Sequence, residues 1–363
     1  MTRSFAELPG LVEELLSEHD RVALVYFDAF GWRFLERHSD HRLFASASVE
    51  KWSAQFPSTT TVHSTTIHTG LPLAEHGLYE WHVYEPRLDR LIIPLFLCFA
   101  GELRRDSALA AGLRVEDVFP FPTLYQRLEV PSHVVMPATF AASSPNVRLT
   151  AGSTVHPFRT PADGFARLAG ALAAEERAYG TIYLPDVDSF MHEHGPDAPE
   201  VPGLIDATLT ALADAPWPDG TLVLVTADHG MAAISPERTS YLNVVWPELA
   251  RHLVHGADGK PLAPAGSARD VFLHVLPDRL DEVHAELARR LEGKAEVRRT
   301  DDGLFPELTE TLRARLANLV VLPHPGEAAY WLDPPWFEQR FLAQHGGLSP
   351  DEMEIPLVRW LVG

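Results

Sequence analysis

The sequence predicts an α/β fold: a doubly wound, mostly parallel central sheet with helices on both faces and a smaller inserted α+β lobe. Two runs, Arg21–Phe27 (RVALVYF) and Thr221–Thr226 (TLVLVT), are apolar without alternation, as in strands covered on both faces. Strands and helices in alternation favour a parallel sheet. Asp28 follows the first run directly, and Asp228 follows the second after one alanine. Ligands bind beyond the carboxyl ends of parallel strands, so both acids are candidate site residues.

The amino-terminal part of the chain supplies the first strand and the helices around it. The segment MTRSFAELPGLVEELLSEHD has helical spacing, and a loop after Asp28 leads into a second helix. The hydroxyl-rich segment Phe56–Gly70 (FPSTTTVHSTTIHTG) has Pro near its start and Gly at its end, which suit the boundaries of a helix. We further expect a helical piece near Val115–Leu128 and a short strand near His133–Met136.

The remaining chain continues the alternation and then changes its pattern. A helix, a strand that ends in acids and a helix precede the strand Thr221–Thr226: Pro161–Tyr179, Thr181–Leu184 and Leu204–Ala215. Beyond Met231 we expect a strand, a highly charged helix and a strand: Val271–Val275, Arg279–Leu291 and Leu319–Leu322. We therefore predict a core of residues 1–235 and 336–363 and an inserted αβ lobe of residues 236–335.

Composition narrows the classes of partner. The 363 residues carry a formal net charge of -20, which disfavours binding to nucleic acid or to anionic membranes. This charge does not exclude a phosphate substrate, because bound metal ions would reverse the local field. Cys98 is the only cysteine, so disulfides within the chain and cysteine-based zinc sites are excluded. We expect Cys98 to be a packed small hydrophobe.

Targeting signals are not evident. The amino-terminal helix carries acids where a signal peptide needs an apolar core, and the longest apolar patch, Leu91–Ala100, is too short to span a bilayer. We expect a cytoplasmic protein without a membrane partner; the oligomeric state stays open.

Ligand-type side chains occur in four separate segments, each placed after an apparent strand or in a loop: Asp28; Asp188 and His192; Asp228 and His229; and His345. Three carboxylates and three imidazoles suit zinc, manganese or iron better than calcium or magnesium alone, and they suffice for two ions. Each has a plain alternative. Asp28 can cap a helix, and the Asp-His-Gly sequence at 228–230 can be an ordinary turn in which Gly has a positive φ.

The candidate metal ligands do not include a nucleophile. The run Thr59–Thr61 supplies candidates for that role. A threonine hydroxyl is weakly nucleophilic until a metal lowers its pKa or a base removes its proton. At a helix N-terminus the hydroxyl would also lie where backbone amides favour an anionic phosphate. The alternative is that these threonines only cap and pack the helix.

Together these segments resemble a known family. FPSTTTVHSTTIHTGLPLAEHG, DSFMHEHGP, TADHG and HGGLSPDEMEIP, preceded by Asp28, resemble the nucleotide pyrophosphatase and phosphodiesterase branch of the alkaline phosphatase superfamily. The resemblance implies one metal on Asp28, Asp228 and His229, and another on Asp188, His192 and His345. It selects Thr60 as the nucleophile, ten residues before the Gly of the Thr-Gly pair. It implies two ions, commonly zinc, and a double displacement through phosphothreonine.

One departure from the family pattern concerns the substrate. Related nucleotide pyrophosphatases have an Asn five residues after the His of the Ser/Glu-His-Gly turn, whereas this chain has Trp81, with Glu80 and His82 beside it. Either another group replaces the Asn as a donor or the substrate differs. Trp81, Tyr79 and Trp32 can form an aromatic wall for a base or aryl group, or pack in the core.

The resulting hypothesis is a metal-dependent hydrolase that acts on phosphodiester or nucleotide pyrophosphate bonds in a small-molecule phosphate ester. A phosphomonoesterase or a phosphonate hydrolase on the same site is the alternative within enzymes. The alternative outside enzymes is a protein that binds a phosphorylated ligand without turning it over.

Overall fold

The computed structural model describes residues 2–102, 104–335 and 337–363. Its largest sheet has seven strands, in the order β2-β18-β9-β1-β8-β6-β7. In that order they span Ser48–Ser53, Glu354–Leu361, Thr221–Thr226, Arg21–Phe27, Ala178–Leu184, Ser132–Pro137 and Thr154–Phe158. β1 pairs in parallel with β8 and β9, and only β18 runs antiparallel to its neighbours. The predicted mostly parallel sheet is confirmed.

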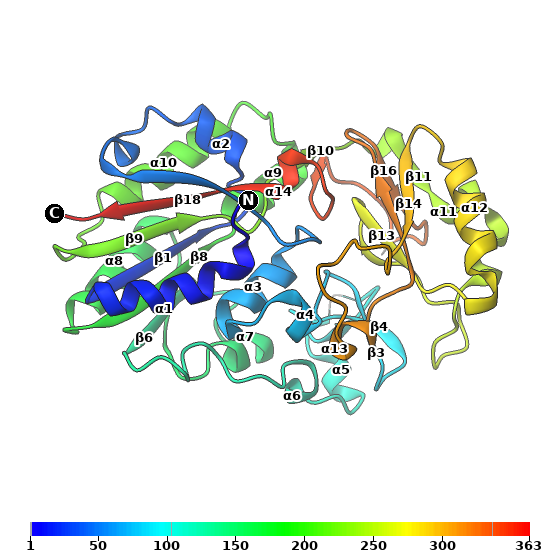
Figure 1. The fold of residues 1–363 in the computed structure, drawn as a ribbon, viewed down its shortest axis with the longest axis horizontal. Helices are drawn as coiled ribbons and strands as arrows, with labels where there is room; N and C mark the ends of the chain where they lie inside the picture. Colours follow the sequence, from blue (N-terminus) through cyan, green and yellow to red (C-terminus); the bar gives the residue numbers. More distant parts are fainter. Residues whose placement is uncertain (1, 103, 336) are drawn as a thin grey trace.

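Helices cover both faces of this sheet. The helix α1 (Leu8–Glu18) lies in front of the sheet in Figure 1, and α8 (Pro161–Ala173) and α10 (Val201–Ala213) lie behind it. Every residue of β9, and every residue of β1 except Arg21, is buried between these layers. The uninterrupted apolar runs of both strands follow from this burial on two sides.

Most predicted elements are found close to their expected places, with β1 and β9 matching residue for residue. The helix predicted near Val115–Leu128 is wrong. α6 spans only Val115–Val118, because Pro120 and Pro122 follow and cannot donate helical hydrogen bonds. The helix predicted to reach Tyr179 ends at Ala173, because Ala178 and Tyr179 already pair with β1 as the start of β8.

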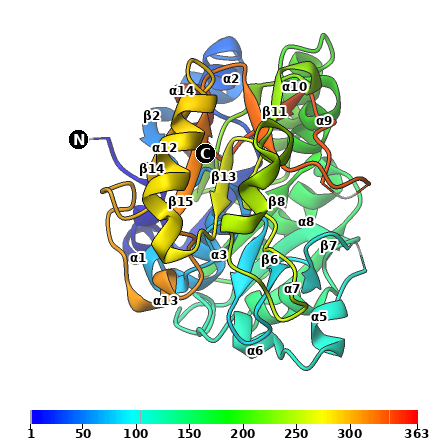
Figure 2. The ribbon, with the colours of Figure 1, turned by 90° about the vertical axis from the view of Figure 1, so that its right-hand side faces the viewer.

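A second lobe lies beside the carboxyl ends of the central strands (Figure 1). Its sheet, in the order β12-β13-β15-β14, contains Ala265–Ser267, Asp270–Leu273, Leu319–Pro323 and Ala295–Arg299. Figure 2 shows α12 (Leu280–Arg290) in front of this sheet. The three-stranded sheet β3-β4-β5 (Val83–Glu85, Arg90–Ile93 and Cys98–Phe99) shares a hydrophobic cluster with Phe272 and Val320. The division into a core and a lobe of residues 236–335 stays a prediction.

The remaining elements are short. They are α2 (Trp32–Arg37), α3 (Thr60–Thr69), α4 (Leu73–His76), α5 (Ser107–Ala110), α7 (Ser144–Leu149), α9 (Asp186–His194), α11 (Leu242–Val245), α13 (Glu310–Arg313), α14 (Pro350–Met353), β10 (Ala232–Ala233), β11 (Thr239–Tyr241), β16 (Ala328–Tyr330) and β17 (Ala343–Gln344). Among the helices of the described residues, none combines the length and apolarity needed to cross a membrane.

A two-stranded ladder returns the chain from the second lobe to the central sheet. β10, which follows the Asp228 loop, pairs antiparallel with β17, so that Ala232 faces Gln344 and Ala233 faces Ala343. More than a hundred residues lie between these partners in the sequence. The ladder therefore places the residues after β17 beside the loop after β9.

The loops after β1 and β9 touch through two glycines. A Cβ atom on Gly31 would lie 2.6 Å from the Cα of Gly230, and a Cβ atom on Gly230 would lie 2.1 Å from the carbonyl oxygen of Asp351. Gly230 is not among the glycines of positive φ in the described chain. Close approach of backbone, rather than a left-handed turn, explains the glycine of Asp-His-Gly.

We predict that Gly230→Ala destabilises the protein, whereas the same exchange at Gly10 stabilises it. The new methyl group at position 230 meets rigid backbone, which costs roughly 1–3 kcal/mol or more. Gly10 lies exposed in α1 with no heavy atom within 4 Å of a Cβ, so alanine there gains about 0.5–1 kcal/mol of helix stability. Denaturant unfolding of both variants measures the two changes, and equal effects would contradict the close-approach explanation.

Candidate active site

The six predicted ligand residues meet at the carboxyl ends of the central strands. Asp28 follows β1, Asp228 and His229 follow β9, Asp188 and His192 lie one turn apart on α9 after β8, and His345 follows β17. Ligand atoms of Asp28, Asp228 and His229 all lie within 4.8 Å of one another, and so do those of Asp188, His229 and His345. The first set is the predicted one. In the second, His229 takes part where His192 was expected.

His192 nevertheless belongs to the cluster. Its Nε2 atom lies 3.4 Å from Asp188 Oδ1, and Nε2 of His345 lies 3.7 Å from the same oxygen. On the other side, Nε2 of His229 lies 3.1 Å from Asp228 Oδ2 and 3.6 Å from Asp28 Oδ1. The structure thus brings all six residues together, while their roles as ligands stay a prediction.

The histidine rings are held in one tautomer by the backbone. Nδ1 lies 2.9 Å from the carbonyl oxygen of Gly230 in His229, 3.0 Å from that of Ala343 in His192, and 2.9 Å from that of Ser58 in His345. A carbonyl oxygen can only accept, so each Nδ1 carries the proton and donates it. All three Nε2 atoms keep their lone pairs and face carboxylates, which is the arrangement of histidine ligands to a metal.

Two carboxylate oxygens of the cluster lack a hydrogen-bond donor among the residues that the structure describes. The oxygens that face the imidazoles, Asp28 Oδ1 and Asp188 Oδ1, are buried and accept no hydrogen bond from the described residues. Burial and the charges of Asp228 and Asp188 raise the pKa of Asp28 well above its usual value. A buried carboxylate oxygen without a donor is stabilised by a proton or by a cation. The six side chains therefore fit divalent metal ions.

Two tyrosines orient the first carboxylate pair. The Tyr26 hydroxyl, on β1, donates to Asp228 Oδ2 at 2.8 Å, and the Tyr183 hydroxyl, on β8, donates to Asp28 Oδ2 at 2.5 Å. The Tyr183 bond engages Oδ2 of Asp28, so that Oδ1 faces His229. The Tyr26 bond engages the same oxygen of Asp228, Oδ2, that faces His229. Sequence reasoning missed both tyrosines, although a polar tip in an apolar strand two residues before Asp28 was the available signal.

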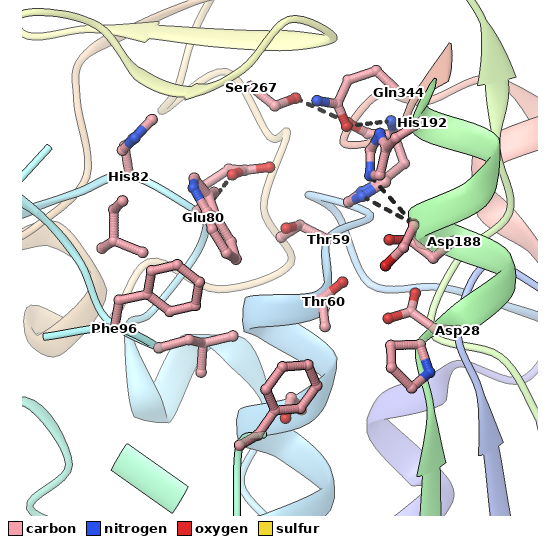
Figure 3. Close-up of a pocket in the computed structure, with 18 of the residues that line it drawn as sticks. Asp28, Thr59, Thr60, Glu80, His82, Phe96, Asp188, His192, Ser267 and Gln344 are labelled. Atoms are coloured by element: carbon pink, nitrogen blue, oxygen red, sulfur yellow. Dashed lines mark hydrogen bonds and ion pairs between the residues drawn. The ribbon is translucent and has the colours of Figure 1, made fainter. Parts of the chain in front are cut away.

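Thr60 is the hydroxyl that faces the cluster (Figure 3). It is the first residue of α3, it is partly exposed, and its Oγ1 atom lies 3.2 Å from His229 Nε2. Thr59 and Thr61 are fully buried. His63 donates from Nδ1 to the Thr59 carbonyl oxygen at 2.7 Å and accepts at Nε2 from the Gln55 amide at 2.8 Å, which fixes the start of the helix.

Ser58 joins the loop of the nucleophile candidate to the loop of His345. Its hydroxyl donates to the Gly347 carbonyl oxygen at 2.9 Å and accepts from the Gly346 amide at 3.1 Å, while its carbonyl oxygen accepts from His345. These bonds place the second group of ligands directly over the start of α3. Ser58 was not predicted, because its partners lie almost 290 residues away.

A cavity of about 620 Å³ opens in front of these groups. Thr60 and four of the six ligand candidates, Asp28, Asp188, His192 and His345, line it together with aromatic side chains. Phe341 packs against His192 and Phe140 lies near Tyr183, whereas Trp81 and Phe96 pack against each other. Trp81 meets Phe96 edge to face, with 5.1 Å between ring centroids. Of the three aromatics considered from the sequence, Trp81 alone lines the cavity: Tyr79 is buried in the core and Trp32 lies under Lys51. Cys98 is buried, as predicted.

A doubly wound sheet with carboxylates and imidazoles gathered at its strand ends defines an α/β protein with a metal-binding site. The model of one family, type I phosphodiesterase / nucleotide pyrophosphatase, matches residues 22–346. The chain belongs to this family of hydrolases, and the resemblance inferred from the motifs is confirmed.

The individual relatives share only low sequence identity with this chain. Ectonucleotide pyrophosphatase/phosphodiesterase family member 3 of Rattus norvegicus is 23% identical over 272 residues, or 72% of this chain; the chain spans only 28% of that relative. The structure of murine ectonucleotide pyrophosphatase / phosphodiesterase 5 has a TM-score of 0.69 at 18% identity and covers 93% of this chain and 87% of its own. Phosphonoacetate hydrolase from Sinorhizobium meliloti, in complex with phosphonoacetate, has a TM-score of 0.63 at 17% identity, with coverages of 94% and 90%.

We predict that Tyr26→Phe weakens metal binding by about 10- to 100-fold, because Asp228 loses the donor that orients it. Competition with a chromophoric chelator measures the affinity. Tyr179→Phe is the matched control, since this buried tyrosine of β8 donates to none of the ligand carboxylates in the described structure. An unchanged affinity in Tyr26→Phe would show that Asp228 does not need this hydrogen bond.

Proposed function

We propose that this protein is a phosphodiesterase that uses two divalent ions and a phosphothreonine intermediate on Thr60. The observation that carries the proposal is the position of Thr60 Oγ1, 3.2 Å from His229 Nε2, on the wall of a cavity shared with the ligand cluster. Substrates of this type include nucleotide pyrophosphates, because the bond that breaks joins phosphorus to oxygen in both.

The residues divide into two groups for the metals. Asp28, Asp228 and His229 would hold the ion beside Thr60, and Asp188, His192 and His345 would hold the other. Oxygen and imidazole donors suit zinc, with manganese or iron as alternatives. When bound, the ions supply the positive charge that lowers the pKa of the Thr60 hydroxyl and neutralises the phosphoryl oxygens.

The helix α3 contributes binding of the phosphoryl group. Thr60 is its first residue and lines the cavity, so the helix begins at the cavity wall. The backbone amide groups of the first turn lack acceptors within the helix and are available to an anionic phosphoryl group. The oxygen of Thr60 forms a bond to phosphorus as the bond to the leaving alcohol breaks. Water then cleaves the phosphothreonine and releases the phosphate monoester.

The apolar wall favours a diester with an aromatic or apolar group. Trp81 and Phe96 offer ring faces and edges to a base or an aryl group. Two arginines also line the cavity: Arg105 lies over the Phe96 ring at 3.9 Å, and Arg340 is paired with Glu338.

A phosphonate hydrolase is the second candidate, because the similar Sinorhizobium meliloti enzyme was seen with phosphonoacetate. We expect kcat/KM for an aryl phosphodiester to exceed that for phosphonoacetate and for the matched aryl monoester. Initial rates on the three substrates with one preparation of the metal-loaded protein measure this order. A rate on phosphonoacetate or the monoester above that on the diester would reverse the assignment.

We predict that Thr60→Ala lowers phosphodiesterase activity by at least about 10³-fold, because the nucleophile is removed. Elemental analysis should still find about two divalent ions per chain, since the six carboxylate and imidazole ligand candidates are unchanged. Thr61→Ala is the control, because Thr61 is buried and does not line the cavity. Retained activity in Thr60→Ala would refute the nucleophile. Ligand-induced stabilisation without turnover in the unaltered protein would instead favour a binding protein.

A further inference from the structure

Two buried carboxyl groups lie near each other: Glu80, which lines the cavity, and Asp270, which is not among the lining residues. Glu80 precedes Trp81, and Asp270 begins β13; neither is exposed to solvent. Glu80 Oε2 accepts from the Trp81 amide, and Asp270 Oδ1 accepts from the Ser267 amide at 3.1 Å and hydroxyl at 2.6 Å. Glu80 Oε1 and Asp270 Oδ2 accept no hydrogen bond within the described chain.

No basic side chain neutralises this pair among the described residues. Arg269 precedes Asp270 in the sequence, but its guanidinium group binds Glu352 instead. It donates two hydrogen bonds to that carboxylate, of 3.0 and 2.9 Å. His82 lies two residues after Glu80 in the sequence, but burial lowers its pKa to about 4, so its ring is neutral. Thr59, Tyr79, Tyr330 and, at longer range, His229 also face Glu80, and Glu352 faces Asp270.

The pair keeps one negative charge above neutral pH. Two adjacent buried carboxyl groups cannot both ionise without a large cost, so one of them holds a proton. Burial raises the pKa of Glu80 to about 7, and burial with the charge of Glu80 raises that of Asp270 well above its usual value. Glu80 lines the cavity and Asp270 does not, so we place the charge on Glu80 and the proton on Asp270.

This charge lies next to the place where phosphorus must bind. Glu80 lies beside Thr59, the residue that precedes Thr60, and Glu80 and Thr60 line the same cavity. Figure 3 shows Glu80 across from Thr59 and Thr60, on the side away from Asp28 and Asp188. A phosphoryl group at Thr60 is thus placed between the metal ligands and Glu80.

We propose that Glu80, supported by Asp270, is a specificity-determining residue that selects monoanionic phosphodiesters against dianionic phosphate monoesters. This inference rests on the proposed phosphoesterase function. A monoester carries nearly two negative charges near neutral pH and a diester carries one. Coulomb repulsion from a fixed carboxylate scales with the charge of the substrate, and the enclosed cavity weakens screening by solvent.

The test compares kcat/KM for an aryl phosphate monoester and the matched diester at a pH of about 8.5, where both carboxyl and monoester are ionised. In Glu80→Gln we expect the monoester-to-diester ratio to rise about tenfold, equivalent to about 1.4 kcal/mol. Glu80→Asp keeps the charge and should keep the ratio low. Glu75→Gln makes the same exchange on an exposed residue of α4 and should leave the ratio unchanged.

An unchanged ratio in a folded Glu80→Gln protein, judged by its circular dichroism and melting transition, would overturn the inference. So would an equal rise in Glu75→Gln, which would indicate a general effect of net charge. If glutamine prevents folding, Glu80→Met provides a second neutral side chain for the same ratio. Failure of the proposed function is distinct, because it would appear as undiminished activity on both substrates in Thr60→Ala.

Discussion

Everything at this site depends on a convergence of lone pairs. Three carboxylates and three imidazole Nε2 atoms face one another at the carboxyl ends of β1, β8 and β9, largely shielded from water. Such a cluster repels itself unless cations occupy it, so the surrounding fold must hold the groups in place against that repulsion. Hydrogen bonds from Tyr26 and Tyr183, and backbone carbonyls behind each imidazole, provide that support.

The elements of the fold that could be predicted are those whose sequence signal lies within a few contiguous residues. β1 and β9 are uninterrupted apolar runs, so their ends and the acids after them could be located directly. Elements whose limits depend on tertiary pairing were less accessible. Nothing local in Ala178 or Tyr179 distinguishes the start of β8 from the end of α8; only pairing with β1 does so. The prolines after Val118, by contrast, are a local signal from which the end of α6 can be predicted.

The site shows the same division. The residue types and order of the six ligand candidates, together with the family resemblance, were enough to propose them and Thr60. Their supports were not visible, because Tyr26, Tyr183 and Ser58 act on partners far away in sequence. Glu80 was noticed only as a neighbour of Trp81. Its buried neighbour Asp270 lies 190 positions later in the chain, on β13 of the second lobe.

The ladder of β10 and β17 has an evolutionary consequence. The chain leaves this ladder at Ala233 and returns to it at Ala343, and these two residues are paired neighbours. Whatever lies between them closes a loop whose ends are already fixed in space, and the entropy of closing such a loop grows only slowly with its length. Insertions or deletions there can remodel the part of the cavity wall that this segment supplies, which includes Ser267, Ala268 and Tyr330, while His229 and His345 stay in register. Substrate range can thus diverge among descendants of one ancestral sequence without any change to the cluster that performs the chemistry.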